Sequence, residues 1–206
     1  STSAALPPLD ADRQRVVTSF IEESNSSEGR ALKRRCIGEI LTAQPQMDAP
    51  TLASIASFVN ESNSIAGRQL KLERLQRIAQ TAQPLGHAHV EALSTLVNES
   101  NGLEGRGLKL NAVETMFLKR PTLPPGVLRA TTTWVNDANS LPARRARLES
   151  TLDLLDAYPG VSGEVFERAG RTTVGAPTTA EGLARLQTTI PELMARAELA
   201  ARSATV

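Results

Sequence analysis

Apolar residues recur at helical spacing in paired segments along most of the chain, and polar residues separate the segments. In the first pair, Phe20 and Ile21 belong to one segment, and Leu32, Cys36 and Ile40 belong to the next. Such spacing is typical of one face of an amphipathic helix. The pattern predicts four pairs of helices over about residues 11–23 and 27–42, 51–61 and 65–81, 87–99 and 103–119, and 126–137 and 142–157.

One stretch of this pattern returns at a constant interval of 38 residues. Its copies read FIEESNSSEGRALK, FVNESNSIAGRQLK, LVNESNGLEGRGLK and WVNDANSLPARRAR, and they begin at Phe20, Phe58, Leu96 and Trp134. These four starting residues occupy equivalent positions of the repeat and form one apolar column. A second apolar column of equivalent positions consists of Ile40, Ile78, Met116 and Leu154. A fixed period of about 20–50 residues is typical of repeat arrays. We expect both columns to lie where one unit packs on the next.

These periodicities predict an all-α fold, namely a right-handed α-α solenoid of about four 38-residue two-helix repeats with a degenerate C-terminal cap. The predicted parts are a disordered tail at residues 1–9, repeats at about residues 10–46, 47–84, 85–122 and 123–159, and a degenerate fifth repeat with capping helices at 160–206. In the last part, Thr178 and Thr189 each begin a capping-box pattern, which predicts two successive helices ending near Thr188 and Arg202.

An Asn-Ser pair between the two helices of a unit predicts a tight αα-hairpin. Asn tolerates the left-handed conformation that often ends a helix, and a Ser hydroxyl caps the N-terminus of the next helix. The Asn column is therefore assigned a structural role at the junction, and it consists of Asn25, Asn63, Asn101 and Asn139.

After each junction come two basic residues spaced three positions apart, such as Arg30 and Lys33 in the first unit of the repeat. Cations in the first turns of a helix face the positive end of its dipole, which costs a few tenths of a kcal/mol, so we expect a compensating partner. Pairing with an acidic column at the end of the preceding helix is the favoured interpretation, and that column consists of Glu23, Glu61, Glu99 and Asp137. The alternative is a basic edge that binds an acidic partner, formed by Arg30, Lys33, Arg68, Lys71, Arg106, Lys109, Arg144 and Arg147.

Composition narrows the classes of function. Of the 206 residues, 40% are hydrophobic but only 3% are aromatic, so the core must consist mainly of Leu, Ile, Val and Ala. The formal net charge of +1 argues against nucleic acid or an anionic membrane as the partner. Cys36 has no second cysteine with which to form a disulfide, and we expect it in the core. No apolar run is long enough for a membrane span.

Candidate chemistry is sparse. The chain contains no GxxxxGK[ST], HExxH or GxSxG motif, and the two histidines, His87 and His89, are spaced so that they point to different faces of a helix. We therefore predict no catalytic residue, no metal site, no cofactor and no enzyme activity. The first residues, STSAALPPLD, lack an initiator Met and a leader pattern, so we expect a piece of a longer chain or a processed one.

In period and general shape, the chain resembles the HEAT and armadillo α-solenoids. Its Ala- and Arg-rich helical array also resembles type III secreted effectors of plant-pathogenic bacteria with SKWP repeats, although the SKW motif itself is absent. These resemblances imply a soluble, monomeric, non-catalytic scaffold that binds a protein partner, as a virulence effector inside a host cell or in the cytoplasm. The alternative is a nucleic-acid-binding array. Arrays that read bases need junction residues that vary, whereas the junctions here are alike.

Overall fold

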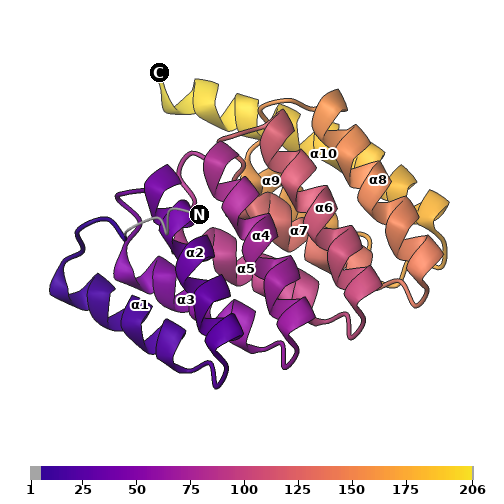
Figure 1. Ribbon diagram of the computed structural model, residues 1–206. Helices are drawn as coiled ribbons and strands as arrows, with labels where there is room; N and C mark the ends of the chain where they lie inside the picture. Colours follow the sequence, from indigo (N-terminus) through magenta and orange to yellow (C-terminus); the bar gives the residue numbers. More distant parts are fainter. Residues whose placement is uncertain (1–5, 206) are drawn as a thin grey trace. The chain divides into compact units, whose positions relative to one another are not determined.

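The computed structural model describes residues 6–205, and within this range every regular element is an α-helix (Figure 1). The predicted tail lies partly outside it, because residues 1–5 are not described. The helices are α1 (Ala11–Glu22), α2 (Ser27–Ala43), α3 (Ala49–Asn60), α4 (Ile65–Thr81), α5 (His87–Asn98), α6 (Leu103–Lys119), α7 (Pro125–Asn136), α8 (Leu141–Ala157), α9 (Gly163–Arg171) and α10 (Thr179–Ala204). The predicted all-α fold is thus confirmed.

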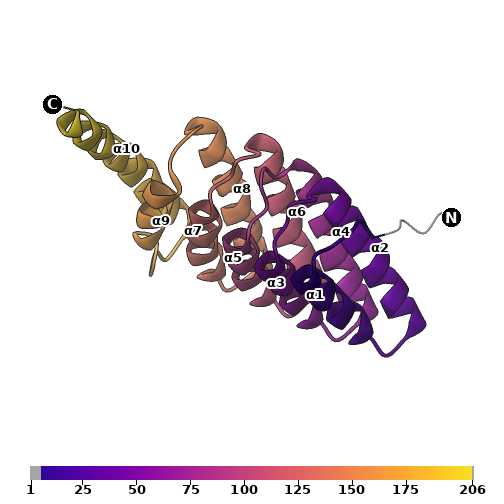
Figure 2. The same cartoon turned by 90° about the vertical axis from the view of Figure 1, so that its left-hand side faces the viewer.

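Contacts divide the chain into two compact units, Ser1–Thr122 and Leu123–Val206. In the first unit the 12-residue helices α1, α3 and α5 lie side by side in one layer, and the 17-residue helices α2, α4 and α6 form a second layer (Figures 1 and 2). In the second unit, α7 packs against α8 and α9, and α10 packs against α8 and α9. Within the units, α1 packs against α2, α3 against α4, α5 against α6 and α7 against α8, so each short helix pairs with the long helix that follows it.

The apolar columns form the core of each unit. Every member of the two columns that the sequence singles out is at most 3% exposed. Cys36 is completely buried as a free thiol, as expected. Burying a Leu, Ile or Phe side chain contributes about 1.5–3 kcal/mol, so these columns supply much of the free energy that holds the hairpins together. None of the described helices combines the length and apolarity that crossing a membrane requires.

Local capping follows the predicted chemistry. The hydroxyl groups of Ser26, Ser64 and Ser140 accept hydrogen bonds from backbone N–H groups in the first turns of α2, α4 and α8. Thr178 does the same for α10. Each bond satisfies one of the N–H groups that a helix start leaves without an intrahelical acceptor.

The predicted left-handed conformation of the junction Asn residues is wrong. Among residues 6–205, only Gly160 and Gly175 have a positive φ. The short helices instead end on right-handed residues such as Glu23 and Glu61. The following N–H groups then bond to the carbonyl three residues back, as at Ser62, and this tightened last turn needs no left-handed residue.

The two helices predicted after Thr178 are a single helix. α10 continues through Pro191 to Ala204 and buries Ile190 and Leu193 along one side. Proline removes one helical N–H donor. Pro191 is exposed, so the carbonyl group that loses this donor, that of the exposed Gln187, can bond to water. Burial of the apolar side therefore outweighs the break that proline encodes locally.

Candidate functional site

A lysine from each long helix of the first unit reaches back to the end of the preceding short helix. Its ammonium group donates to the carbonyl group 13 residues earlier, at 2.7 or 2.8 Å, from Lys33 to Phe20, from Lys71 to Phe58 and from Lys109 to Leu96. All three lysines are at most 1% exposed. The negative end of a helix dipole attracts cations, so the lysines stabilise the C-termini of α1, α3 and α5. This contact compensates for their unfavourable place near the start of the long helices.

The aromatic residues of the first column contribute to the same contact. The Lys33 ammonium lies 4.4 Å from the ring centroid of Phe20, and that of Lys71 lies 4.6 Å from the centroid of Phe58. In the second unit, the Arg147 guanidinium carbon lies 4.3 Å from the ring centroid of Trp134, and its Nη1 donates to the Trp134 carbonyl at 2.8 Å. Cations buried against aromatic faces lose less on desolvation than cations in an aliphatic core.

The arginine column bonds to the junction backbone. Each guanidinium donates to the carbonyl six residues earlier, at 2.5–2.8 Å, from Arg30 to Ser24, from Arg68 to Ser62, from Arg106 to Ser100 and from Arg144 to Ala138. These carbonyl groups lie just beyond the short helices, where no intrahelical donor is available. The arginine column therefore closes each hairpin turn.

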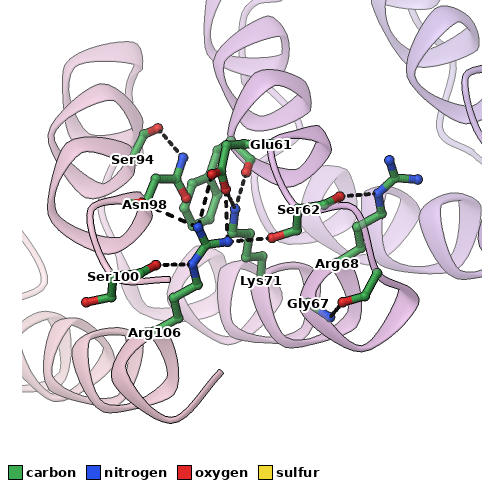
Figure 3. Close-up of polar contacts among 11 residues, drawn as sticks. Glu61, Ser62, Gly67, Arg68, Lys71, Ser94, Asn98, Ser100 and Arg106 are labelled. Carbon is green, nitrogen blue, oxygen red and sulfur yellow. Dashed lines mark hydrogen bonds and ion pairs between the residues drawn. The ribbon is translucent and has the colours of Figure 1, made fainter. Parts of the chain in front are cut away.

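Glu61 is the centre of a charged network that joins two hairpins of the first unit (Figure 3). Its carboxylate lies 2.9 Å from Lys71 Nζ and 2.9 Å from Arg106 Nη1, and Arg106 comes from the following hairpin. Arg106 also donates to the hydroxyl group of Ser62 at 2.8 Å. The hydrogen bond from Arg106 lowers the pKa of Glu61, and Lys71 acts in the same direction. Lys109 pairs with Glu99 at 3.1 Å in the next hairpin.

Of the eight basic residues predicted to bind a partner, five are buried. They are Lys33, Lys71, Arg106, Lys109 and Arg147, of which Arg106 is the most exposed at 8%. For Lys71, Arg106 and Lys109 the geometry is the internal pairing that the acidic column suggested. Partner binding by the column stays a prediction, but Lys71 and Lys109 already hold carboxylates of their own hairpins.

The junction column Asn25, Asn63, Asn101 and Asn139 is exposed and directly precedes the helix N-caps. The asparagines that the sequence interpretation passed over lie three residues earlier. Asn60 Nδ2 donates to Glu23 in the preceding hairpin, and Asn98 Nδ2 donates to Ser94. Their recurrence 38 residues apart was a signal that could have identified them.

A shallow groove of about 620 Å³ runs between α3 and α5. Its lining consists of Pro50, Ala53, Ser54, Ser57, His87, Glu91, Ser94 and Thr95. His87 Nε2 lies 3.0 Å from the Glu91 carboxylate, and His87 Nδ1 lies 2.5 Å from Ser54 Oγ. Glu91 lies one turn along the same helix as His87, and the sequence analysis did not single it out.

The contacts among Ser54, His87 and Glu91 resemble a nucleophile, a base and an orienting acid. Acyl transfer also needs donors directed at a developing oxyanion. Ser54 lies inside α3, where backbone N–H groups already bond within the helix, and its hydroxyl group contacts the Pro50 carbonyl at 3.1 Å. The arrangement therefore fits an anchored side-chain network better than an active site. Within residues 6–205, no three His, Cys, Asp or Glu side chains cluster closely enough to hold a metal ion.

The helices and their paired packing define an all-α protein that is consistent with a helical-repeat fold. Neither a protein-family model nor a curated protein nor a solved structure matches the chain.

Proposed function

We propose that this chain is a non-catalytic, right-handed α-α solenoid of 38-residue two-helix repeats, similar in kind to HEAT and armadillo arrays, and that it binds a protein partner. Solenoids present extended surfaces because each repeat contacts only its neighbours. The alternation of 12- and 17-residue helices from α1 to α8 supports the repeat interpretation.

The observation that carries the binding proposal is the groove between α3 and α5. Equivalent positions 38 residues apart are alike at buried sites such as Phe20 and Phe58, whereas some exposed positions of the short helices differ. Arg15, Ala53 and Glu91 occupy one such exposed position on α1, α3 and α5. Residues that maintain the hairpins thus recur, whereas the outer face of the short helices is free to vary with a partner.

The chemistry of the groove favours a protein segment over nucleic acid. Its lining contains no Lys or Arg, and affinity for nucleic acid depends mainly on such cations at the phosphates. Small side chains such as Ala53 and Ser57 allow a partner backbone to approach closely, and the hydroxyl groups can bond to its peptide groups. The buried lysines of the junctions also do not support the nucleic-acid alternative.

Blocking the groove tests the proposal. Arg at both Ala53 and Ser57, which are exposed, adds two long cationic side chains to the lining. The matched control places Arg at Ala31 and Ala66, exposed positions of the long-helix layer, and so adds the same charge elsewhere. Quantitative capture of partner proteins from cell lysate should be lost for A53R/S57R and kept for A31R/A66R, at similar melting temperatures.

Equal capture by both double variants would exclude the groove as the binding surface. Salt-dependent retention on heparin or DNA, without captured protein, would support the nucleic-acid alternative instead. The further proposal of a type III secreted virulence effector rests on the resemblance in period and composition. Delivery of a reporter fused to the chain into plant cells, dependent on a functional secretion system, tests that proposal.

A further inference from the structure

Two equivalent junctions of the first unit, α1–α2 and α3–α4, differ in their charge pairing. The second junction consists of Glu61, Ser62, Lys71 and Arg106. There, two cations from neighbouring hairpins hold one carboxylate, and the guanidinium also bonds to the serine hydroxyl (Figure 3). Every charged group at this junction has an opposite partner.

The first junction contains the same residue types 38 residues earlier, namely Glu23, Ser24, Lys33 and Arg68. Glu23, however, accepts a hydrogen bond from the side-chain amide of Asn60. Within the described residues no ion pair joins Glu23 to Lys33 or to Arg68. Both cations therefore lack the carboxylate that their counterparts hold.

The serine of the first junction also lacks its counterpart's partner. Ser24 is 2% exposed, and its Oγ has no hydrogen-bond partner in the described structure. The equivalent Ser62 Oγ accepts from Arg106 at 2.8 Å. A buried hydroxyl group without a hydrogen bond is destabilising, so such a group is expected to have a partner when the site is filled.

A pocket of about 230 Å³ lies at this junction, and both cations and Ser24 line it. Burial lowers the pKa of Lys33 to about 8. The positive charge of Arg68 also lowers this pKa, whereas the negative charge of Glu23 raises it. A bound anion would remove this penalty on the ammonium group. The pocket also includes Ile65, which is 38% exposed and provides apolar surface beside the cations.

From these contacts we infer that the pocket at the first junction binds a carboxylate from outside the chain, held by Lys33, Arg68 and Ser24. The negative charge of this carboxylate would neutralise Lys33 and Arg68, as Glu61 neutralises Lys71 and Arg106 at the second junction. A carboxylate fits because that group is what the equivalent lysine and arginine hold. The source is either a small organic acid or an acidic side chain of another protein. The inference concerns a different surface from the α3–α5 groove and does not depend on the function proposed for it.

Titration with sodium acetate, followed by NMR against sodium chloride at equal ionic strength, tests the site. Acetate should cause saturable shifts in the amide signals of Ser24 and Gly29, and should raise the pKa of Lys33 measured at its side-chain carbon. Arg68→Gln and Ser24→Ala should each weaken acetate binding, by about tenfold for the charged hydrogen bond of Arg68. The matched substitution Ser62→Ala at the second junction should leave acetate binding unchanged.

A short peptide with one glutamate, compared with the same peptide carrying glutamine, distinguishes the two sources. Tighter binding of the glutamate peptide than of acetate indicates a protein side chain, and binding of acetate alone indicates a small acid. Absence of saturable shifts with both ligands would overturn the inference. The inference would also be overturned if the pKa of Lys33 were near its ordinary value of 10.5 in the wild type and lower in Glu23→Gln. That result would show that the Glu23 carboxylate fills the pocket itself.

Discussion

Arg106 forms a bidentate ion pair with the carboxylate of Glu61, a residue 45 positions earlier in the chain. The Nη1–Oε2 distance is 2.9 Å and the Nη2–Oε1 distance is 3.0 Å. Bidentate pairs of this kind are stronger and more directional than single ion pairs. Since the pair joins consecutive hairpins and also contacts Lys71 through the shared carboxylate, it connects the charged network of one hairpin to the next.

Replacement of Arg106 by Lys should destabilise the protein by about 1–3 kcal/mol, because an ammonium group cannot replace the fork-shaped donor set. Arg77→Lys is the control, since Arg77 is exposed and its Nη1 lies 3.9 Å from Glu114. Exposed pairs of this kind contribute about 0–1 kcal/mol. Urea unfolding of both variants measures the difference, and equal losses would show that the buried network adds no stability.

Glu61 should make stability depend on pH in the acidic range. Hydrogen bonding, chiefly from Arg106, lowers the pKa of Glu61 in the folded state below its ordinary value of 4.5. The unfolded state then binds the proton more readily, so the contribution of Glu61 is present above that value and is lost as the pH falls through the lowered pKa. Urea unfolding at several pH values should show the stability difference between wild type and Glu61→Gln shrinking on acidification. A constant difference would contradict the assigned pairing.

Gly182 should tolerate no side chain. A Cβ atom at this position of α10 would lie 1.9 Å from the Trp134 ring in α7. Alanine normally favours a helix over glycine by about 1 kcal/mol, but here the clash should make Gly182→Ala destabilising by about 1–3 kcal/mol. Gly107→Ala in α6 is the matched control, because the nearest atom would be 3.9 Å away. Thermal unfolding should therefore shift in opposite directions for the two variants.

The helices and their serine N-caps could be predicted from the sequence because each depends on neighbours within a few turns. The apolar period selects the buried face, and the Ser26 and Ser64 hydroxyl groups bond to N–H groups three residues on. The buried columns could also be predicted, since only one face of each helix carries large apolar residues.

The local sequence pattern did not predict the backbone structure correctly where contacts elsewhere in the fold oppose it. A proline at position 191 predicts a helix boundary, yet the buried Ile190 and Leu193 keep α10 continuous. The Asn columns fit a left-handed helix end, yet the tightened last turn of each short helix makes that conformation unnecessary.

The sequence by itself determined which residues form helices and which faces are buried, because those properties depend on short-range periodicity and capping. Only the tertiary structure decided the partners of the charged side chains. A lysine or arginine is long enough to reach several acceptors, and the choice among them depends on which carbonyl or carboxylate the neighbouring hairpin presents. Glu61 thus receives Lys71 and Arg106, whereas Glu23 receives Asn60 and leaves Lys33 and Arg68 beside an open pocket.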